Sequence, residues 1–259
     1  PSPAQSSPGH PGSREQFPPS LHSAKAGLPI VLLEQNRVAG RATSWLSRKA
    51  DVVCLSFPET VVRCDRVELT GNPVRASVAA VRDSQPGRAL LVLGGSQGAV
   101  GLNSLVMSIL DDASHLPEGW RVIHQAGSKD ESRVREHYAS VGIPAEVHSF
   151  ISNMPQAYAD SGLVISRAGG TTIAELCCIG RASVLVPIPK SVRDHQRLNA
   201  ECFAESNAAV VLPQDTAIES ARAELIDLMN SEDRRDELAR SMKLLGNPDA
   251  AAAVADIIA

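Results

Sequence analysis

The segment Ser166–Glu175 (SRAGGTTIAE) combines residue types that suit nucleotide binding. It follows the apolar run Gly162–Ile165, and the glycine pair Gly169–Gly170 allows the backbone to approach a ligand closely. We expect a helix from Thr172 to Ile179, whose first N–H groups lack partners within the helix and attract phosphate. An ordinary glycine turn with a capping threonine would give the same pattern.

Hydroxyl groups and a carboxylate accompany this turn. Thr171 and Thr172 supply hydroxyls beside the expected phosphate position. Glu175 follows about one helical turn later, where other nucleotide-binding folds place a carboxylate that accepts hydrogen bonds from ribose hydroxyls. The segment therefore predicts a site for the phosphate and ribose of a nucleotide.

A second glycine-rich segment, Gly94–Asn103 (GGSQGAVGLN), follows an apolar run and opens an expected helix. Backbone N–H groups and a hydroxyl from this loop could surround a diphosphate, the residues being Ser96, Gln97 and Gly98. The segment lacks the lysine of a P-loop, and Ser96 breaks the glycine spacing of the dinucleotide-binding fingerprint. It indicates phosphate binding without matching either motif.

Two further segments follow expected strands. Phe150–Ile151 offers an apolar side chain and backbone groups that could flank a flat base, although plain core packing explains it equally well. Within Pro187–Asn199, three polar side chains could bond to sugar hydroxyls: Asp194, Gln196 and Asn199. A solvated helix face explains this second segment almost as well.

These segments must be held by strands and helices, and from Arg88 onward apolar runs alternate with amphipathic ones. The expected strands are Ala89–Leu93, Arg121–Gln125, Ala145–His148, Gly162–Ser166, Ser183–Val186 and Ala208–Leu212. Such alternation predicts an α/β fold with a parallel sheet covered by helices on both faces. Ligands bind beyond the carboxyl ends of the strands in such sheets, and all four polar segments fall there.

The chain before this series has a different composition. Residues 1–20 are rich in proline, serine and glycine, and we expect them to be disordered. Two apolar runs, 28–33 and 51–55, are expected strands on either side of a helix over 38–49. These elements predict a shorter α/β unit ahead of the main sheet.

Composition excludes several classes of function. A net charge of −4 over 259 residues leaves no global basic surface for nucleic acid. No run approaches the ~18 apolar residues of a membrane span, so any membrane contact must be peripheral. The five cysteines show no zinc-binding spacing, which favours buried thiols in a reducing compartment.

Five short motifs follow one another along the chain. They are Glu34-Gln35-Asn36 with Gly40, Gly71–Arg75, Gly94–Ala99, Arg167–Glu175 and His195–Asn199. In this order they resemble the MurG family, bacterial enzymes that transfer N-acetylglucosamine from UDP to the lipid-linked muramyl-pentapeptide (lipid I), making lipid II. Each motif is weak alone, but together they span about Leu28 to Leu212.

The resemblance implies a GT-B fold with a complete C-terminal Rossmann-like domain and a partial N-terminal α/β domain. Residues 21–82 would form the acceptor-side domain, 88–230 would bind the UDP-sugar, and helices over 231–259 would pack back toward the N-terminal domain. The implied reaction is an inverting displacement at the anomeric carbon of the sugar by the muramyl C4 hydroxyl, with UDP leaving.

Family members bind the donor with residues that have matches in this sequence. The resemblance implies that Asn36 and Arg75 contact the donor near the cleft. It places Ser96 at the diphosphate, Ile151 at the uracil and Gln196 at the sugar. It assigns phosphate and ribose to Gly170, Thr171, Thr172, Ile173, Ala174 and Glu175. Helix N-termini and Arg75 can carry the diphosphate charge, so neither a metal nor another cofactor is expected.

The sequence also departs from the family pattern. Leu33 stands where members usually have histidine, and nothing here matches their glycine-rich, histidine-ended loop, which carries a candidate base. We therefore expect the chain to bind the donor but not to transfer the sugar alone, with no catalytic base assigned. An unpaired strand edge and an apolar face would favour self-association.

The resemblance places the protein in the cytoplasm, at the inner face of the bacterial plasma membrane. Two other functions stay open. One is a non-catalytic nucleotide-sugar-binding subunit that needs a partner chain. The other is a different UDP-sugar enzyme of the same fold, such as an epimerase.

Overall fold

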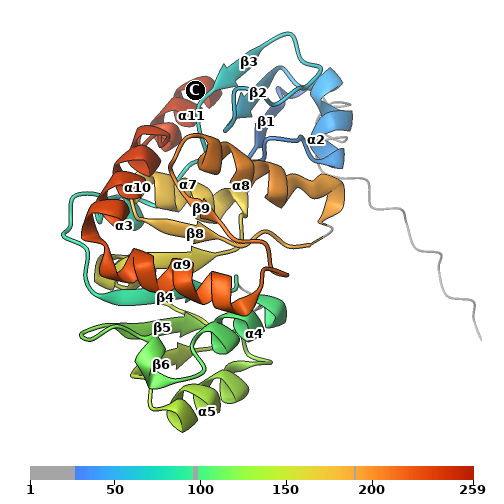
Figure 1. The fold of residues 1–259 in the computed structure, drawn as a ribbon. Helices are drawn as coiled ribbons and strands as arrows, with labels where there is room; N and C mark the ends of the chain where they lie inside the picture. Colours follow the sequence, from blue (N-terminus) through green and yellow to red (C-terminus); the bar gives the residue numbers. More distant parts are fainter. Residues whose placement is uncertain (1–26, 96–98, 190) are drawn as a thin grey trace, which may run out of the picture.

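The computed structural model describes residues 27–95, 99–189 and 191–259, which form two lobes, each built on a parallel sheet (Figure 1). The smaller sheet has the order β1-β2-β3, with strands Val31–Glu34, Val52–Leu55 and Val67–Leu69. All four residues of β2 are buried, as their apolar side chains predict. This sheet confirms the shorter α/β unit expected from the sequence.

The helix of the smaller lobe begins later than the sequence suggested. Helix α2 spans Arg41–Leu46 and continues into the 3-10 turn η1, Ser47–Lys49. The preceding Gly40 is extended, because its N–H donates to the Glu34 carboxylate at 2.8 Å. The expected helical residues before Arg41 are therefore held in a loop.

The larger sheet has the order β6-β5-β4-β7-β8-β9, and every strand pair is parallel. Its strands are β4 Ala89–Leu93, β5 Arg121–Gln125, β6 Ala145–His148, β7 Ser161–Ser166, β8 Ser183–Leu185 and β9 Val210–Val211. The predicted α/β class is confirmed. The central strands β4 and β7 are buried along their whole length, which fits their apolar sequences.

Helices cover both faces of this sheet (Figure 1). The elements are α3 Ala76–Ala79, α4 Val100–Ile109, η2 Ala113–His115, α5 Glu131–Val141, α6 Met154–Asp160, α7 Gly170–Ile179, η3 Val192–Asp194, α8 His195–Glu205 and α9 Ile218–Asn230. Leu90 and Val92 of β4 pack with α4, α5 and α9, whereas Leu91 and Leu93 pack with α6, α7 and α8. Alternate residues of β4 therefore pack against the helices on opposite faces of the sheet.

The chain crosses between the lobes twice. The first crossing follows β3, and the second joins α10, Glu232–Leu244, to α11, Ala250–Ile258. The side-chain amide of Asn247 in the second crossing donates to the Thr70 carbonyl in the first at 2.8 Å. Helix α11 packs on the smaller sheet through Val254, which contacts β2, while α10 packs against α7 and α9. Of these two helices, α11 is the one that returns to the smaller lobe.

Within the described parts of the chain, none of the helices combines the length and apolar character that crossing a bilayer requires.

Candidate functional site

Gln125 connects two loops at the carboxyl edge of the larger sheet. It ends β5, and its side chain is almost fully buried. Its amide nitrogen donates to the Gly95 carbonyl after β4 at 3.0 Å, and its amide oxygen accepts from the Ile151 N–H after β6 at 2.9 Å. The sequence analysis missed this residue, although a polar residue closing an apolar strand was a signal for it.

The glycine-rich loop after β4 lies partly outside the described residues, which end at Gly95 and resume at Ala99. The predicted diphosphate contacts Ser96, Gln97 and Gly98 fall in that gap. The loop ends approach closely, because a Cβ on Gly94 would lie 2.9 Å from the Ala99 nitrogen. A glycine is therefore required where this loop turns from β4 into α4.

The structure places Ile151 differently from its neighbour. The Ile151 side chain is buried in the core beside α6 and α7, whereas Phe150 is 62% exposed. Because the Ile151 N–H is already held by Gln125, the open surface at this loop belongs to Phe150. Ile151 remains a predicted uracil contact, and in this conformation its side chain serves core packing.

Helix α7 begins at Gly170, two residues before the predicted start. The preceding Gly169 is extended and has no side-chain cap, so the first N–H groups of the helix are left for water or a ligand. Thr171 is exposed beside them and donates its hydroxyl to the Gln35 amide oxygen at 3.0 Å. A helix start of this kind attracts negative charge.

Glu175 joins two parts of the predicted site. Its carboxylate accepts a hydrogen bond from the Tyr158 hydroxyl at 2.8 Å and pairs with the Arg75 guanidinium at 3.2 Å. Burial, together with the adjacent Glu175 charge, raises the pKa of Tyr158 well above its usual value, so the phenol stays a donor. The Arg75 side chain is 62% exposed. The ion pair thus presents an accessible cation beside the first turns of α7.

Arg75 reaches this position from the first crossing. Helix α3 begins at Ala76, and the preceding Arg75 is extended. An extended residue directs its side chain away from the helix that follows, which allows the contact with α7. The contact brings together two of the family motifs, Gly71–Arg75 and Arg167–Glu175.

Glu34 organises the loop that carries the Glu34-Gln35-Asn36 motif. Its carboxylate is buried and accepts hydrogen bonds from the Asn36 N–H and side-chain amide, both at 3.1 Å, and from Gly40 N–H. Three donors replace the water that a buried carboxylate loses. Asn36 is therefore held in one orientation, toward the larger lobe.

Asn199 receives this loop on the larger lobe. Its amide oxygen accepts from the Arg37 N–H at 2.9 Å, and its amide nitrogen donates to Asn36 at 3.1 Å and to the Ala168 carbonyl at 3.2 Å. The residue is fully buried. Gln196 is also buried, and its oxygen accepts from the Ile188 N–H at 3.0 Å. In this conformation Asn199 and Gln196 hold protein segments in place. The third predicted sugar contact, Asp194, precedes α8 and forms an ion pair with Arg197 at 3.6 Å.

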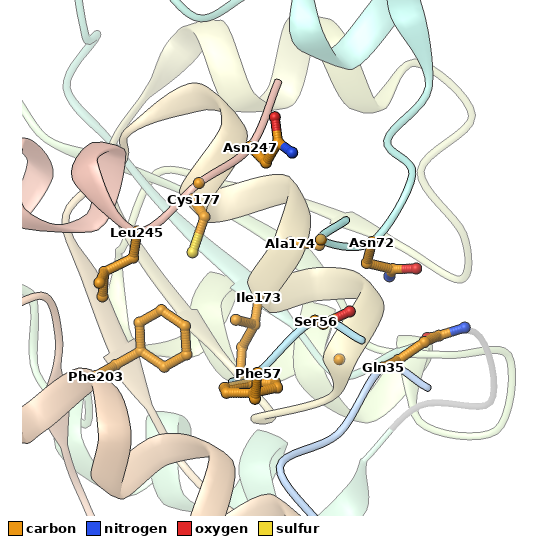
Figure 2. A pocket seen from close by; sticks show the side chains of 13 residues that line it. Gln35, Ser56, Phe57, Asn72, Ile173, Ala174, Cys177, Phe203, Leu245 and Asn247 are labelled. Atoms are coloured by element: carbon orange, nitrogen blue, oxygen red, sulfur yellow. The ribbon is translucent and has the colours of Figure 1, made fainter. Parts of the chain in front are cut away.

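A small cavity lies between the lobes on the other side of α7. Figure 2 shows Phe57, Phe203 and Ile173 gathered at one end of it, and Asn72 and Gln35 toward the other. Gly170, Ile173, Ala174 and Cys177 share the helix face that lines the cavity, whereas Glu175 lies on the opposite face. Helix α7 therefore separates this cavity, whose lining is partly apolar and partly polar, from the Arg75–Glu175 pair.

Replacing Gln125 with alanine should lower the stability of the fold and weaken UDP binding. The variant leaves the buried Ile151 N–H unpaired, at a cost of about 1 to 3 kcal/mol, and frees the carbonyl of Gly95, which is exposed to water. Chemical unfolding and UDP titration measure the two effects, with Gln156→Ala on exposed α6 as the matched control. Unchanged UDP affinity in the folded Gln125 variant would show that this bridge does not hold the donor loops.

His124, next to Gln125, anchors the start of α4. It is fully buried, with Nδ1 3.0 Å from the Tyr138 hydroxyl and Nε2 3.0 Å from the Asn103 amide oxygen. The Asn103 amide nitrogen donates to the Ala126 carbonyl at 2.9 Å and to Asp130 at 2.7 Å. Burial lowers the pKa of His124 to about 3, so the imidazole remains neutral in the folded protein.

This histidine should make stability depend on pH. In the unfolded chain it takes up a proton near pH 6.5, whereas in the folded protein it does so only near pH 3. The contribution of the neutral His124 to the free energy of unfolding is complete above about pH 6.5. It is lost as the pH falls toward 3, by up to about 1.4 kcal/mol per pH unit. Unfolding free energies at pH 7.5, 6 and 5 should fall more steeply for the natural protein than for His124→Asn. Parallel curves would contradict the buried neutral imidazole.

No group of three or more histidine, cysteine, aspartate or glutamate side chains in the described residues is arranged to hold a metal ion.

Comparison with known proteins places this geometry in a family. The model of the glycosyltransferase family 28 C-terminal domain matches residues 89–254. The chain is 40% identical over 248 residues to the UDP-N-acetylglucosamine--N-acetylmuramyl-(pentapeptide) pyrophosphoryl-undecaprenol N-acetylglucosamine transferase of Pseudomonas syringae, covering 93% of this chain and 68% of that protein. The enzyme of the same name from Ectopseudomonas mendocina is 41% identical, with the same coverage.

A solved structure gives the same result. The crystal structure of Acinetobacter baumannii MurG superposes with a TM-score of 0.74 at 30% identity, covering 95% of this chain and 71% of that one. The chain thus spans about two thirds of the length of these relatives. The resemblance found in the sequence is confirmed: the chain belongs to the MurG family of GT-B glycosyltransferases.

Proposed function

We propose that this chain binds UDP-N-acetylglucosamine between its lobes and serves the transfer of N-acetylglucosamine to lipid I, forming lipid II. The observation that carries the proposal is the Arg75–Glu175 pair, which sets a cation and a carboxylate together at the first turns of α7. The 40% identical relatives are named as transferases of this sugar to the pyrophosphoryl-undecaprenol-linked muramyl-pentapeptide.

The donor would lie against the carboxyl edge of the larger sheet. The start of α7 and the exposed Arg75 guanidinium offer positive potential to a diphosphate. Glu175 already holds Arg75 and Tyr158, so a ribose hydroxyl would donate to the remaining lone pairs of the same carboxylate. The Glu175 carboxylate would then bind both the ribose of the donor and the Arg75 guanidinium.

The same groups suit the chemistry of transfer. When the acceptor hydroxyl displaces UDP from the anomeric carbon, negative charge grows on the leaving diphosphate. Fixed N–H groups at the start of α7 and the Arg75 guanidinium would stabilise that charge without rearrangement. These residues contribute to the departure of UDP, and the acceptor side lies toward the smaller lobe.

The smaller lobe has features that suit peripheral contact with the inner face of a membrane, where a lipid-linked acceptor would be met. Its exposed large apolar side chains include Leu28, Leu33, Trp45, Val61, Val67 and Leu69. Trp45 lies beside the Lys49 ammonium at 5.8 Å from the ring centroid, and a cation next to an indole fits an anionic bilayer surface. The same surface could serve self-association. Sedimentation with and without anionic vesicles separates these two proposals.

A transfer assay with labelled UDP-N-acetylglucosamine and lipid I tests the function. Label recovered in lipid II supports the proposed reaction. Donor binding without product would favour the nucleotide-sugar-binding subunit, and addition of an N-terminal segment from a MurG enzyme would then show whether the part of these relatives that the chain does not match restores transfer. Hydrolysis or epimerisation of the donor without lipid I would contradict the transferase function.

A further inference from the structure

A second cavity lies at the opposite end of the larger sheet from the donor site. We call it the basal cavity, because it is lined by residues at the amino ends of β4, β7 and β8 and by the side of α10. Its volume is about 230 Å³. The parallel strands direct their carboxyl ends toward α7 and Glu175, so this cavity shares no residue with the donor site.

Three arginines line the basal cavity, and the most informative is Arg181. It is 3% exposed, and its guanidinium donates to the Tyr158 carbonyl at 3.0 Å and to the Ser84 carbonyl and hydroxyl at 3.2 and 2.7 Å. All of these acceptors are neutral. A buried charge without a counter-ion is costly, and burial accordingly lowers the pKa of Arg181.

The other two arginines add to the positive potential. Arg235 packs over the Trp120 ring at 5.1 Å, and one of its terminal nitrogens donates to the Leu228 and Met229 carbonyls. Among the described residues, the second terminal nitrogen of Arg235 has no hydrogen-bond partner. Burial lowers the pKa of Arg235, and the charge of the exposed Arg88 acts in the same direction, whereas Glu232 and Asp236 act against it. Two like charges are thus kept close together at one cavity.

The acidic residues at the rim offset only part of the charge of these arginines. Glu232 and Asp236 of α10 also line the cavity and are exposed. Among the described residues, neither carboxylate forms an ion pair within 4.0 Å with any of the three guanidinium groups. The formal balance of three cations and two anions leaves the cavity positive, with the buried charge of Arg181 at its wall.

We propose that the basal cavity binds a phosphoryl group, held by Arg88, Arg181 and Arg235. Guanidinium groups match the oxygens of a phosphoryl group and pair with them through charge-assisted hydrogen bonds. The volume corresponds to about eight water molecules at ~30 Å³ each, which accommodates inorganic phosphate or a small phosphomonoester. The site goes beyond the proposed transferase function and does not depend on it.

A phosphoryl group bound in the basal cavity would contact both α10 and the amino ends of the strands of the larger sheet. Gly162 and Gly87 form part of the wall, and a Cβ on Gly162 would lie 2.5 Å from the Gly87 carbonyl oxygen. On the strand side of the cavity the two backbone segments thus lie close together, while α10 supplies Arg235 from the other side. A ligand that bridges the two sides should raise the unfolding temperature, and the shift should keep growing with the logarithm of the ligand concentration above its Kd.

Titration with inorganic phosphate tests the proposal, at constant ionic strength and with saturating UDP so that any phosphate site at α7 is filled. Arg88→Ala removes an exposed cation without opening the core and should weaken phosphate binding about tenfold, equivalent to ~1.4 kcal/mol. Arg240→Ala, on α10 outside the cavity, makes the same charge change and should leave the affinity unchanged. Asp236→Asn and Glu232→Gln should tighten binding by a few fold, because each removes a repelling charge.

The outcomes are distinct from those of the transferase proposal. The proposal would be overturned if the Arg88 and Arg240 variants lost phosphate affinity equally, or if Asp236→Asn weakened phosphate binding. Loss of phosphate binding when UDP is added would also overturn it, since the anion would then lie at the donor site. Binding of glycerol phosphate but not of inorganic phosphate supports the site and identifies a phosphomonoester as its ligand; binding of neither overturns it. Failure to bind UDP would count against the transferase proposal alone.

Discussion

Replacing Glu175 with alanine should weaken UDP binding by about 1 to 3 kcal/mol, the range for hydrogen bonds to a charged group. The variant removes the acceptor proposed for the ribose and also frees Arg75 from its partner. It should lower stability as well, because the buried Tyr158 hydroxyl loses its acceptor. Glu175→Gln keeps an oxygen for Tyr158 and should recover much of the stability while losing the charge.

Calorimetric titration with UDP and chemical unfolding separate the two effects. Glu219→Ala, an exposed carboxylate on α9, makes the same charge change away from the site and serves as the control. A folded Glu175 variant that binds UDP as tightly as the natural protein would remove Glu175 from the donor site.

Replacing Asn199 with alanine should release the contact between the lobes. The substitution removes hydrogen bonds to Asn36, to the Arg37 N–H and to the Ala168 carbonyl. Each buried group left unpaired costs about 1 to 3 kcal/mol, so we expect a loss of several kcal/mol unless the lobes separate and admit water. Domain opening would relieve that cost and weaken donor binding.

Small-angle scattering and limited proteolysis at the two crossings report the opening directly. Asn230→Ala, at the exposed end of α9, is the matched control. An Asn199 variant with natural stability, natural dimensions and natural donor affinity would contradict the role of this residue as the link between lobes.

The sequence predicted the main sheet well, because its strands are apolar and lie between two helical layers. Ala89–Leu93 and Arg121–Gln125 were expected with their observed bounds, and both are largely buried. The predictions were less accurate for short strands: a strand was expected over 208–212, but β9 spans only Val210–Val211. Helix starts were also displaced where glycine or a distant carboxylate, as at Gly40, set the backbone.

The partners of the site residues could not be predicted from their positions in the sequence. Arg75 and Glu175 are 100 residues apart, and Asn36 and Asn199 are 163 apart. Their contacts depend on how the two lobes pack, which local patterns do not encode. The polar character of Asn199 suggested a sugar contact, which stays a prediction, but it could not indicate that the side-chain amide also joins the lobes.

Binding of UDP-N-acetylglucosamine is the central claim, and calorimetric titration against UDP-glucose tests it most directly. The two donors share the nucleotide and diphosphate and differ at the acetamido group, so the comparison isolates recognition of the sugar. We predict saturable binding of UDP-N-acetylglucosamine, about tenfold or more tighter than that of UDP-glucose, a difference of ~1.4 kcal/mol. Absence of binding, or equal affinity for both sugars, would contradict the proposed function.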